Sequence, residues 1–251
     1  MCPCGSPTLR ASFGGMRRFS LTLLLLSLIG LVAGCDLPEG DKTTPEGCYY
    51  QWLQARQQGD ADQIWAQLSE HDQHALNEWF LAEQKTYRLI QQVYLEADEE
   101  NEETRDALEE AKKVLGEVDA IVKATALHSL DKKAALEAID YGVRAKLSGA
   151  KELLRHLMNQ VTAEELSFMQ RSGAFIRTVE VSGTRATITT WAGDSFELQS
   201  SNSAAEGYLW RLALGGEERR GLDAAVSQAQ DNLSRVEGNV GFIHANRLAA
   251  P

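Results

Sequence analysis

Proline and basic residues are both scarce in this chain of 251 residues. Only five residues are proline, and none of them lies between Glu46 and Ala250. Because proline is the residue that most reliably interrupts helices, long helices are permitted over that whole stretch. Three arginines and no acidic residue precede Cys35, so the rest of the chain has 22 basic and 36 acidic residues, a formal charge of −14. That acidity argues against nucleic acid or anionic lipid as a direct partner.

Sequence signatures of catalysis are missing as well. The chain contains no nucleophile elbow, phosphate-binding loop, CxxC pair or HExxH pair. Cysteine is limited to positions 2, 4, 35 and 48. We interpret residues 1–15, which carry the first two cysteines, as lying ahead of a true start at Met16. We expect Cys48 to be a packed thiol. A disulfide between Cys35 and Cys48 is the alternative if Cys35 carries no lipid.

The only long apolar run lies near the N-terminus and has the layout of a secretory signal. Arg17 and Arg18 precede 16 residues without a charge, the last of which are the small residues Ala33 and Gly34 before Cys35. A membrane-spanning helix needs about 20 apolar residues, so residues 16–34 predict a cleaved signal peptide. The string LVAGC, ending at Gly34 and Cys35, resembles the lipobox of bacterial lipoproteins. The resemblance implies cleavage between these two residues and lipid on Cys35, which would hold the chain at a membrane of the cell envelope. The sequence leaves open which membrane that is.

Helix signals follow a polar segment, residues 35–44, which we expect to be a tether. Thr44 with Pro45, Asp60 and Ser69 are placed to begin three successive helices. From about residue 83 to 146 the pattern stays helical and becomes strongly charged, which predicts a helical insertion. Its apolar seam recurs at spacings of three and four residues and comprises Leu108, Ala111, Leu115, Val118 and Val122.

This seam requires a partner helix. The interpretation that we favour is an antiparallel hairpin within the chain, packed around Leu89, Val93 and Tyr94 or around Leu136 and Ile139. The alternative is a second envelope protein that docks on the seam.

A change of period marks the second half of the chain. After an amphipathic helix near residues 148–158 and a capping box at Thr162–Glu165, the apolar period becomes two. Four strands are predicted, at residues 175–181, 185–191, 195–199 and 208–214, with a polar loop from Ser200 to Gly207. Residues 215–251 predict a C-terminal helix with an apolar face from Leu222 to Val236, followed by a loose glycine-containing tail.

Helices followed by an antiparallel meander predict an α+β fold. Two stretches, PEGCYYQWLQARQQGDADQIWAQLS and VEVSGTRATITTWAGDSFEL followed by YLWRLAL, resemble the nuclear transport factor 2-like superfamily. The resemblance implies a cone-shaped domain over residues 45–214, interrupted by the helical insertion. Enzymes of the superfamily hold polar residues inside the cone, and the candidates here are Tyr50, Asp194 and Tyr208.

Other chemistry is sparse. His71 and His74 lie three residues apart and are weak candidates for metal ligands, since no third ligand stands at a recognisable spacing. The sequence predicts no cofactor. The favoured function is a non-catalytic binding or protein-interaction module held at the membrane through Cys35. The alternative is an envelope isomerase or dehydratase acting on a small apolar substrate.

Overall fold

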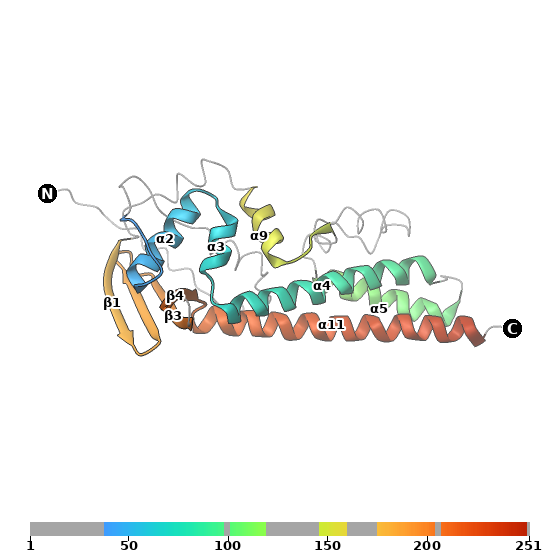
Figure 1. The fold of residues 1–251 in the computed structure, drawn as a ribbon. Coiled ribbons are helices and arrows are strands. Elements are labelled where there is room, and N and C mark those ends of the chain that lie inside the picture. Colours follow the sequence, from blue (N-terminus) through green and yellow to red (C-terminus); the bar gives the residue numbers. More distant parts are fainter. Residues whose placement is uncertain (1–37, 98–100, 119–145, 160–174, 204–206, 250–251) are drawn as a thin grey trace, which may run out of the picture.

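A computed structural model describes residues 38–97, 101–118, 146–159, 175–203 and 207–249 (Figure 1). These residues confirm the α+β class. The helices are α2 (Pro45–Gln57), α3 (Ala61–Gln67), α4 (Glu70–Glu96), α5 (Glu102–Val118), α9 (Ala150–Met158) and α11 (Gly216–Ala249). The strands are β1 (Ile176–Ser182), β2 (Arg185–Thr190), β3 (Ser195–Ser203) and β4 (Gly207–Ala213).

The three predicted helix starts are confirmed. Thr44, Asp60 and Ser69 precede α2, α3 and α4, and each side chain accepts a hydrogen bond from the backbone N–H three residues on, at 3.0, 3.0 and 3.1 Å. These bonds satisfy donors that the helix itself leaves free. Gly59 turns the chain between α2 and α3 with a φ of 66°, a conformation that residues with a Cβ avoid.

The sheet is a plain antiparallel meander in the order β1-β2-β3-β4. One face carries the aligned residues Ala186, Leu198 and Leu212, all buried, and α2 packs against it. The expected loop from Ser200 to Gly207 is wrong in its first part, because residues 200–203 continue β3 and pair with residues 207–210 of β4. Strand pairing needs backbone hydrogen bonds and not apolar side chains, so a polar stretch can extend a strand.

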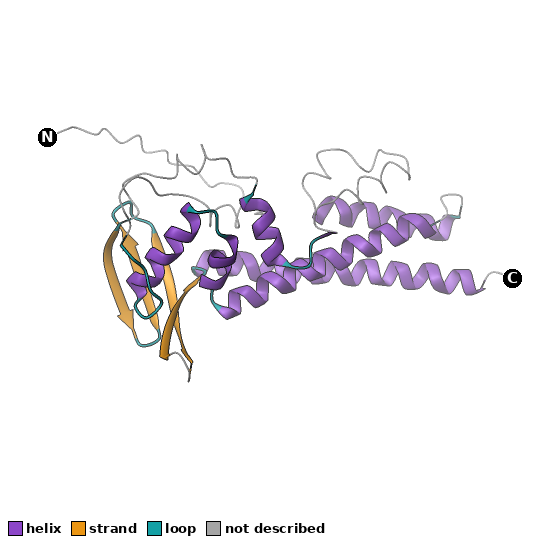
Figure 2. Ribbon diagram, turned by 45° about the horizontal axis from the view of Figure 1, so that its top comes forward, coloured by secondary structure: helices purple, strands orange, loops and turns teal. Residues whose placement is uncertain are grey.

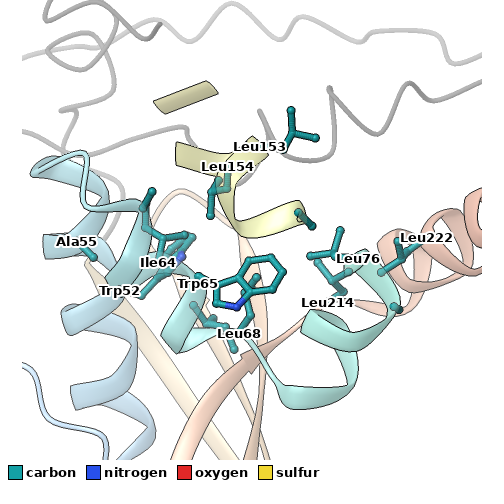
Figure 3. Packing of buried hydrophobic residues seen from close by; sticks show 14 of the residues in the cluster. Trp52, Ala55, Ile64, Trp65, Leu68, Leu76, Leu153, Leu154, Leu214 and Leu222 are labelled. Atoms are coloured by element: carbon teal, nitrogen blue, oxygen red, sulfur yellow. The ribbon is translucent and has the colours of Figure 1, made fainter. Parts of the chain in front are cut away.

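The larger of two apolar cores joins the sheet to the helices around it. Figure 3 shows Trp52 of α2, Ile64 and Trp65 of α3, and Leu154 of α9 gathered in one cluster. The same cluster contains Leu76 of α4, Leu214 just after β4 and Leu222 of α11. Burying side chains of this size contributes roughly 1.5–3 kcal/mol each. This core therefore supplies most of the free energy that holds the sheet end of the molecule together.

The second core lies in a long arm formed by α4, α5 and α11, which extends away from the sheet (Figure 2). Helices α4 and α11 run parallel, because Glu78, Lys85 and Gln92 contact Gln230, Glu237 and His244, three pairs with the same separation of 152 residues. Steps of seven residues along both helices are the spacing of a coiled coil. At 1.5 Å per residue, the 34 residues of α11 span about 51 Å.

The predicted seam lies inside this arm. Leu108, Ala111 and Leu115 of α5 are buried in the same cluster as Val93 and Tyr94 of α4, which confirms the hairpin within the chain. Residues Val236 and Ile243 of α11 join that cluster. The described part of the seam is thus covered by the chain itself and is not a free docking face. Val122, the capping box at Thr162–Glu165 and the alternative partners Leu136 and Ile139 lie outside the described residues.

The C-terminal tail is helical, which corrects the expectation of a loose segment. Helix α11 continues through Gly238 and Gly241 to Ala249. Glycine costs about 1 kcal/mol relative to alanine inside a helix, so propensity alone favoured an earlier end. Packing of Val236, Val240 and Ile243 against α4 and α5 outweighs that cost. The boundary expected near residue 83 also has no counterpart, since α4 is continuous from Glu70 to Glu96.

The expected tether is wrong for most of its length. Residues 38–44 pack on the domain: the Pro38 carbonyl accepts a hydrogen bond from Gln54 Nε2 at 3.1 Å, and the Lys42 carbonyl accepts one from the Trp210 backbone N–H at 2.7 Å. A Cβ on Gly40 would stand 2.4 Å from the backbone of α2. A polar composition favoured a free segment, but backbone groups and a glycine are what this close approach uses.

A buried carboxylate connects the sheet to the helical arm. Asp72 in the first turn of α4 is 0% exposed. It accepts hydrogen bonds from Ser69 Oγ at 2.5 Å and from the Leu214 backbone N–H at 3.1 Å, and it forms an ion pair with Arg219 of α11. The Ser69 backbone N–H donates to the Leu212 carbonyl at 2.7 Å. The start of α4, the end of β4 and the start of α11 therefore meet at one side chain.

The helical tail is tested by replacing Gly238 and Gly241 with alanine. Both lie in α11, and a Cβ on either would meet no atom within 4 Å. We expect each substitution to raise the free energy of unfolding by about 0.5–1 kcal/mol, measured by chemical denaturation. The control is Gly59→Ala, which should lower it because of the positive φ. Unchanged stability in both helix variants would mean that this stretch is not helical.

Candidate functional site

Aromatic side chains fill the inner face of the sheet where a cone pocket was expected. The Phe196 ring of β3 lies 5.1 Å from the Tyr49 ring and 5.3 Å from the Trp52 ring, centroid to centroid. The Tyr49 and Trp52 rings are 5.9 Å apart on α2. Such distances are those of closely packed aromatic pairs. These three rings therefore pack directly between α2 and β3.

A buried arginine lies beside this cluster. Arg56 is only 5% exposed, and its guanidinium carbon stands 4.3 Å from the centre of the Trp52 ring. Its Nε and Nη2 atoms have no hydrogen-bond partner. Burial lowers the pKa of Arg56 to about 9, while Tyr49 and Asp194 act to raise it. A buried cation without a carboxylate partner is costly, and the contact with the Trp52 ring offsets only part of that cost.

The neighbouring acidic groups are unsuited to proton transfer at neutral pH. Burial raises the pKa of the Cys48 thiol to about 12 and that of the Tyr49 hydroxyl well above its ordinary value. Both groups therefore stay protonated. Cys48 is buried and free of any disulfide, as expected of a packed thiol. A nucleophile or a general base requires a pKa near the working pH, which neither group has.

The residues singled out as candidates in the cone are not brought together. Tyr50 is half-buried with its ring against Tyr49 at 5.6 Å, and Asp194 lies exposed in the turn between β2 and β3. The backbone of Tyr208 pairs with Asn202 toward the other end of the sheet. Of the three, Asp194 is the one whose charge acts on Arg56.

His71 and His74 are both exposed on the first turns of α4. Within the part of the chain that the structure describes, no three His, Cys, Asp or Glu side chains are grouped to hold a metal ion. The structure thus adds no third ligand to this pair among the described residues. In the same residues, no helix combines the length and apolar character that a membrane span needs.

The arm carries an open groove of about 570 Å³ between α5 and α11. Arg235 Nε donates a hydrogen bond to Glu110 Oε1 at 2.7 Å inside it. The remaining lining is polar and carries both signs of charge. Side chains of both signs in one groove suit a protein surface of matching pattern better than a small apolar ligand. The lining residues are Glu110, Lys113, Gln228, Asp231, Ser234 and Arg235.

Comparison with known proteins gives no match to this chain among protein-family models, curated proteins or solved structures. The resemblance to the nuclear transport factor 2-like superfamily therefore stays a prediction.

Sequence reasoning missed Arg56 and only partly found Asp72. Arg56 continues the buried face of α2 that Tyr49 and Trp52 define at spacings of three and four residues. A charged residue at a position where this spacing calls for an apolar one was the available signal of a buried cation. Asp72 lies three residues after the predicted helix start at Ser69, but its partner Arg219 is 147 residues farther along the chain, and nothing local indicates that pairing.

The unpaired state of Arg56 predicts that Arg56→Met stabilises the protein. Because burial lowers the pKa of the folded state, the cost of the charge is fully present below pH 9 and falls as the pH rises from about 9 toward the ordinary value of 12.5. At pH 7 we expect the free energy of unfolding to rise by about 1 kcal/mol, measured by chemical denaturation.

The matched control is Arg219→Met, which leaves the carboxylate of Asp72 buried without its partner. It should lower the free energy of unfolding by about 3 kcal/mol or more. A loss of similar size for Arg56→Met would contradict the account of an unpaired cation.

Proposed function

We propose that this chain is an envelope lipoprotein, held at a membrane through lipid on Cys35, whose folded part is a non-catalytic binding or protein-interaction module. The support for the anchor is the sequence from Arg17 to Cys35: two arginines, an apolar run of signal length, and small residues before the cysteine. Two or three acyl chains on one residue are enough for stable attachment, since each buried methylene contributes about 0.8 kcal/mol.

The position of Cys35 relative to the fold supports a closely held domain. Only Asp36 and Leu37 separate Cys35 from Pro38, whose carbonyl accepts a hydrogen bond from Gln54 of α2. Three fully extended residues reach about 11 Å at most. A lipid on Cys35 would therefore hold the domain directly against the membrane, without a long linker between them.

The inner face of the sheet favours the non-catalytic function over the isomerase-like alternative. An enzyme of that type requires an open pocket with a carboxylate or histidine beside a second polar group. Here Tyr49, Trp52 and Phe196 fill the space, and Asp194, the nearby carboxylate, is exposed in a turn. Arg56 carries its proton at neutral pH and has no ability to act as a base there.

The arm supplies the surface for a partner. It extends from the sheet end (Figure 1), and its groove between α5 and α11 presents Lys113 and Asp231 beside the ion pair of Arg235 and Glu110. An envelope protein with charges in the complementary order would bind there with its orientation fixed by those charges. This surface replaces the apolar seam, whose described residues Leu108, Ala111 and Leu115 are already buried against α4 and α11.

The anchor is tested by mass spectrometry of the protein extracted from bacterial membranes. We expect a mature chain that begins at Cys35 and carries diacylglyceryl and acyl masses, together with fractionation into the membrane. The variant Cys35→Ser should lose both the lipid mass and the cleavage at that site. The matched control is Cys48→Ser, which should keep them, because Cys48 is buried in the folded domain. Membrane attachment of Cys35→Ser with its signal peptide removed would refute the anchor.

A further inference from the structure

Trp191 is exposed in a way that its place in the fold does not require. It lies in the turn between β2 and β3 and is 67% exposed, more than the other large apolar side chains of the described residues. The turn itself is ordered by backbone bonds, from the Trp191 N–H to the Phe175 carbonyl at 3.0 Å and from the Thr190 N–H to the Asp194 carbonyl at 2.9 Å. The Arg177 guanidinium carbon stands 5.5 Å from the Trp191 ring centre, within the range of a cation–π contact.

This turn and the entry of the chain lie at the same end of α2. Pro38 is bonded to Gln54 in the last turns of α2. Arg56 follows Gln54 by two residues and interacts electrostatically with Asp194, which lies in the same turn as Trp191. In Figure 1 the sheet and α2 form one end of the molecule, and the arm points away from them.

From this arrangement we propose that Trp191 and Arg177 lie in the headgroup layer of the membrane, as a second contact beside the lipid. The inference rests on the proposed anchor at Cys35. The polar layer of a bilayer leaflet is about 5–8 Å thick, and the covalent link from Cys35 to Pro38 reaches about 11 Å. The end of the domain around Pro38 is therefore within reach of that layer.

The chemistry of the two side chains fits such a layer. Tryptophan is enriched at membrane interfaces, where its ring is apolar and its N–H finds polar partners. Arginine is able to bind headgroup phosphate with its parallel N–H donors. The net acidity of the chain opposes adsorption to an anionic surface, so the anchor supplies the proximity and Trp191 sets the orientation. The arm then stands away from the membrane and presents its groove at a distance from it.

The contact is tested with the chain from Cys35 onward, carrying Cys48→Ala and coupled through Cys35 to a maleimide phospholipid in phosphatidylcholine vesicles. Brominated acyl chains in the vesicles quench tryptophan emission at short range. We expect quenching in the parent chain and its loss in Trp191→Phe, because Trp52, Trp65, Trp79 and Trp210 are buried. Equal quenching in both chains, or none in the parent, would overturn the proposal.

A matched control moves the tryptophan to the other end of the same sheet. Val181 is 57% exposed near the end of β1, five residues and roughly 16 Å along the strand from Ile176. Val181→Trp in the Trp191→Phe background should show no quenching, and quenching as strong as that of Trp191 would contradict the orientation. Chemical coupling makes this result independent of lipidation in the cell. Mass spectrometry therefore tests whether Cys35 carries lipid, and quenching tests whether Trp191 contacts the membrane.

Discussion

The buried carboxylate of Asp72 is the constraint on which the rest of the structure depends. It belongs to the first turn of α4, yet its other partners are Leu214 after β4 and Arg219 in the first turn of α11. A buried charge is tolerated when it is paired and hydrogen-bonded. Oδ2 of Asp72 accepts hydrogen bonds from Ser69 and Leu214, and Oδ1 forms the ion pair with Arg219. The result is a joint: the sheet ends where both long helices begin, so α4 and α11 leave it side by side and in the same direction.

That common origin determines how the arm is built. Two parallel helices that start together keep their register, as the repeated separation of 152 residues between their contacts shows. Helix α5 returns along both of them, and its apolar seam packs against them. The sheet end has a different character, with a closed aromatic interior and an exposed Trp191 near the entry of the chain. In the proposed arrangement the sheet end faces the membrane and the arm carries the surface for a partner.

Local signals in the sequence were sufficient for the elements and not for their long-range partners. Thr44, Asp60 and Ser69 were identified as helix starts because capping is a contact across three residues. The four strands followed from a period of two. The pairing of Asp72 with Arg219 and the helical state of Gly238 depend on residues far away in the chain. The packing of residues 38–44 was hidden for a related reason, since their contacts to α2 and β4 use backbone carbonyls, which composition does not reveal.

Native-state hydrogen exchange on the wild type and on Asp72→Asn tests the joint most directly. Amides of Ile188 in the sheet and Val236 in the arm report the two cores separately. If Asp72 couples them, both amides open with a similar free energy in the wild type. The substitution should then lower both by a similar amount, about 3 kcal/mol, because Arg219 loses its charged partner. A loss confined to one core, or no loss in either, would contradict the account.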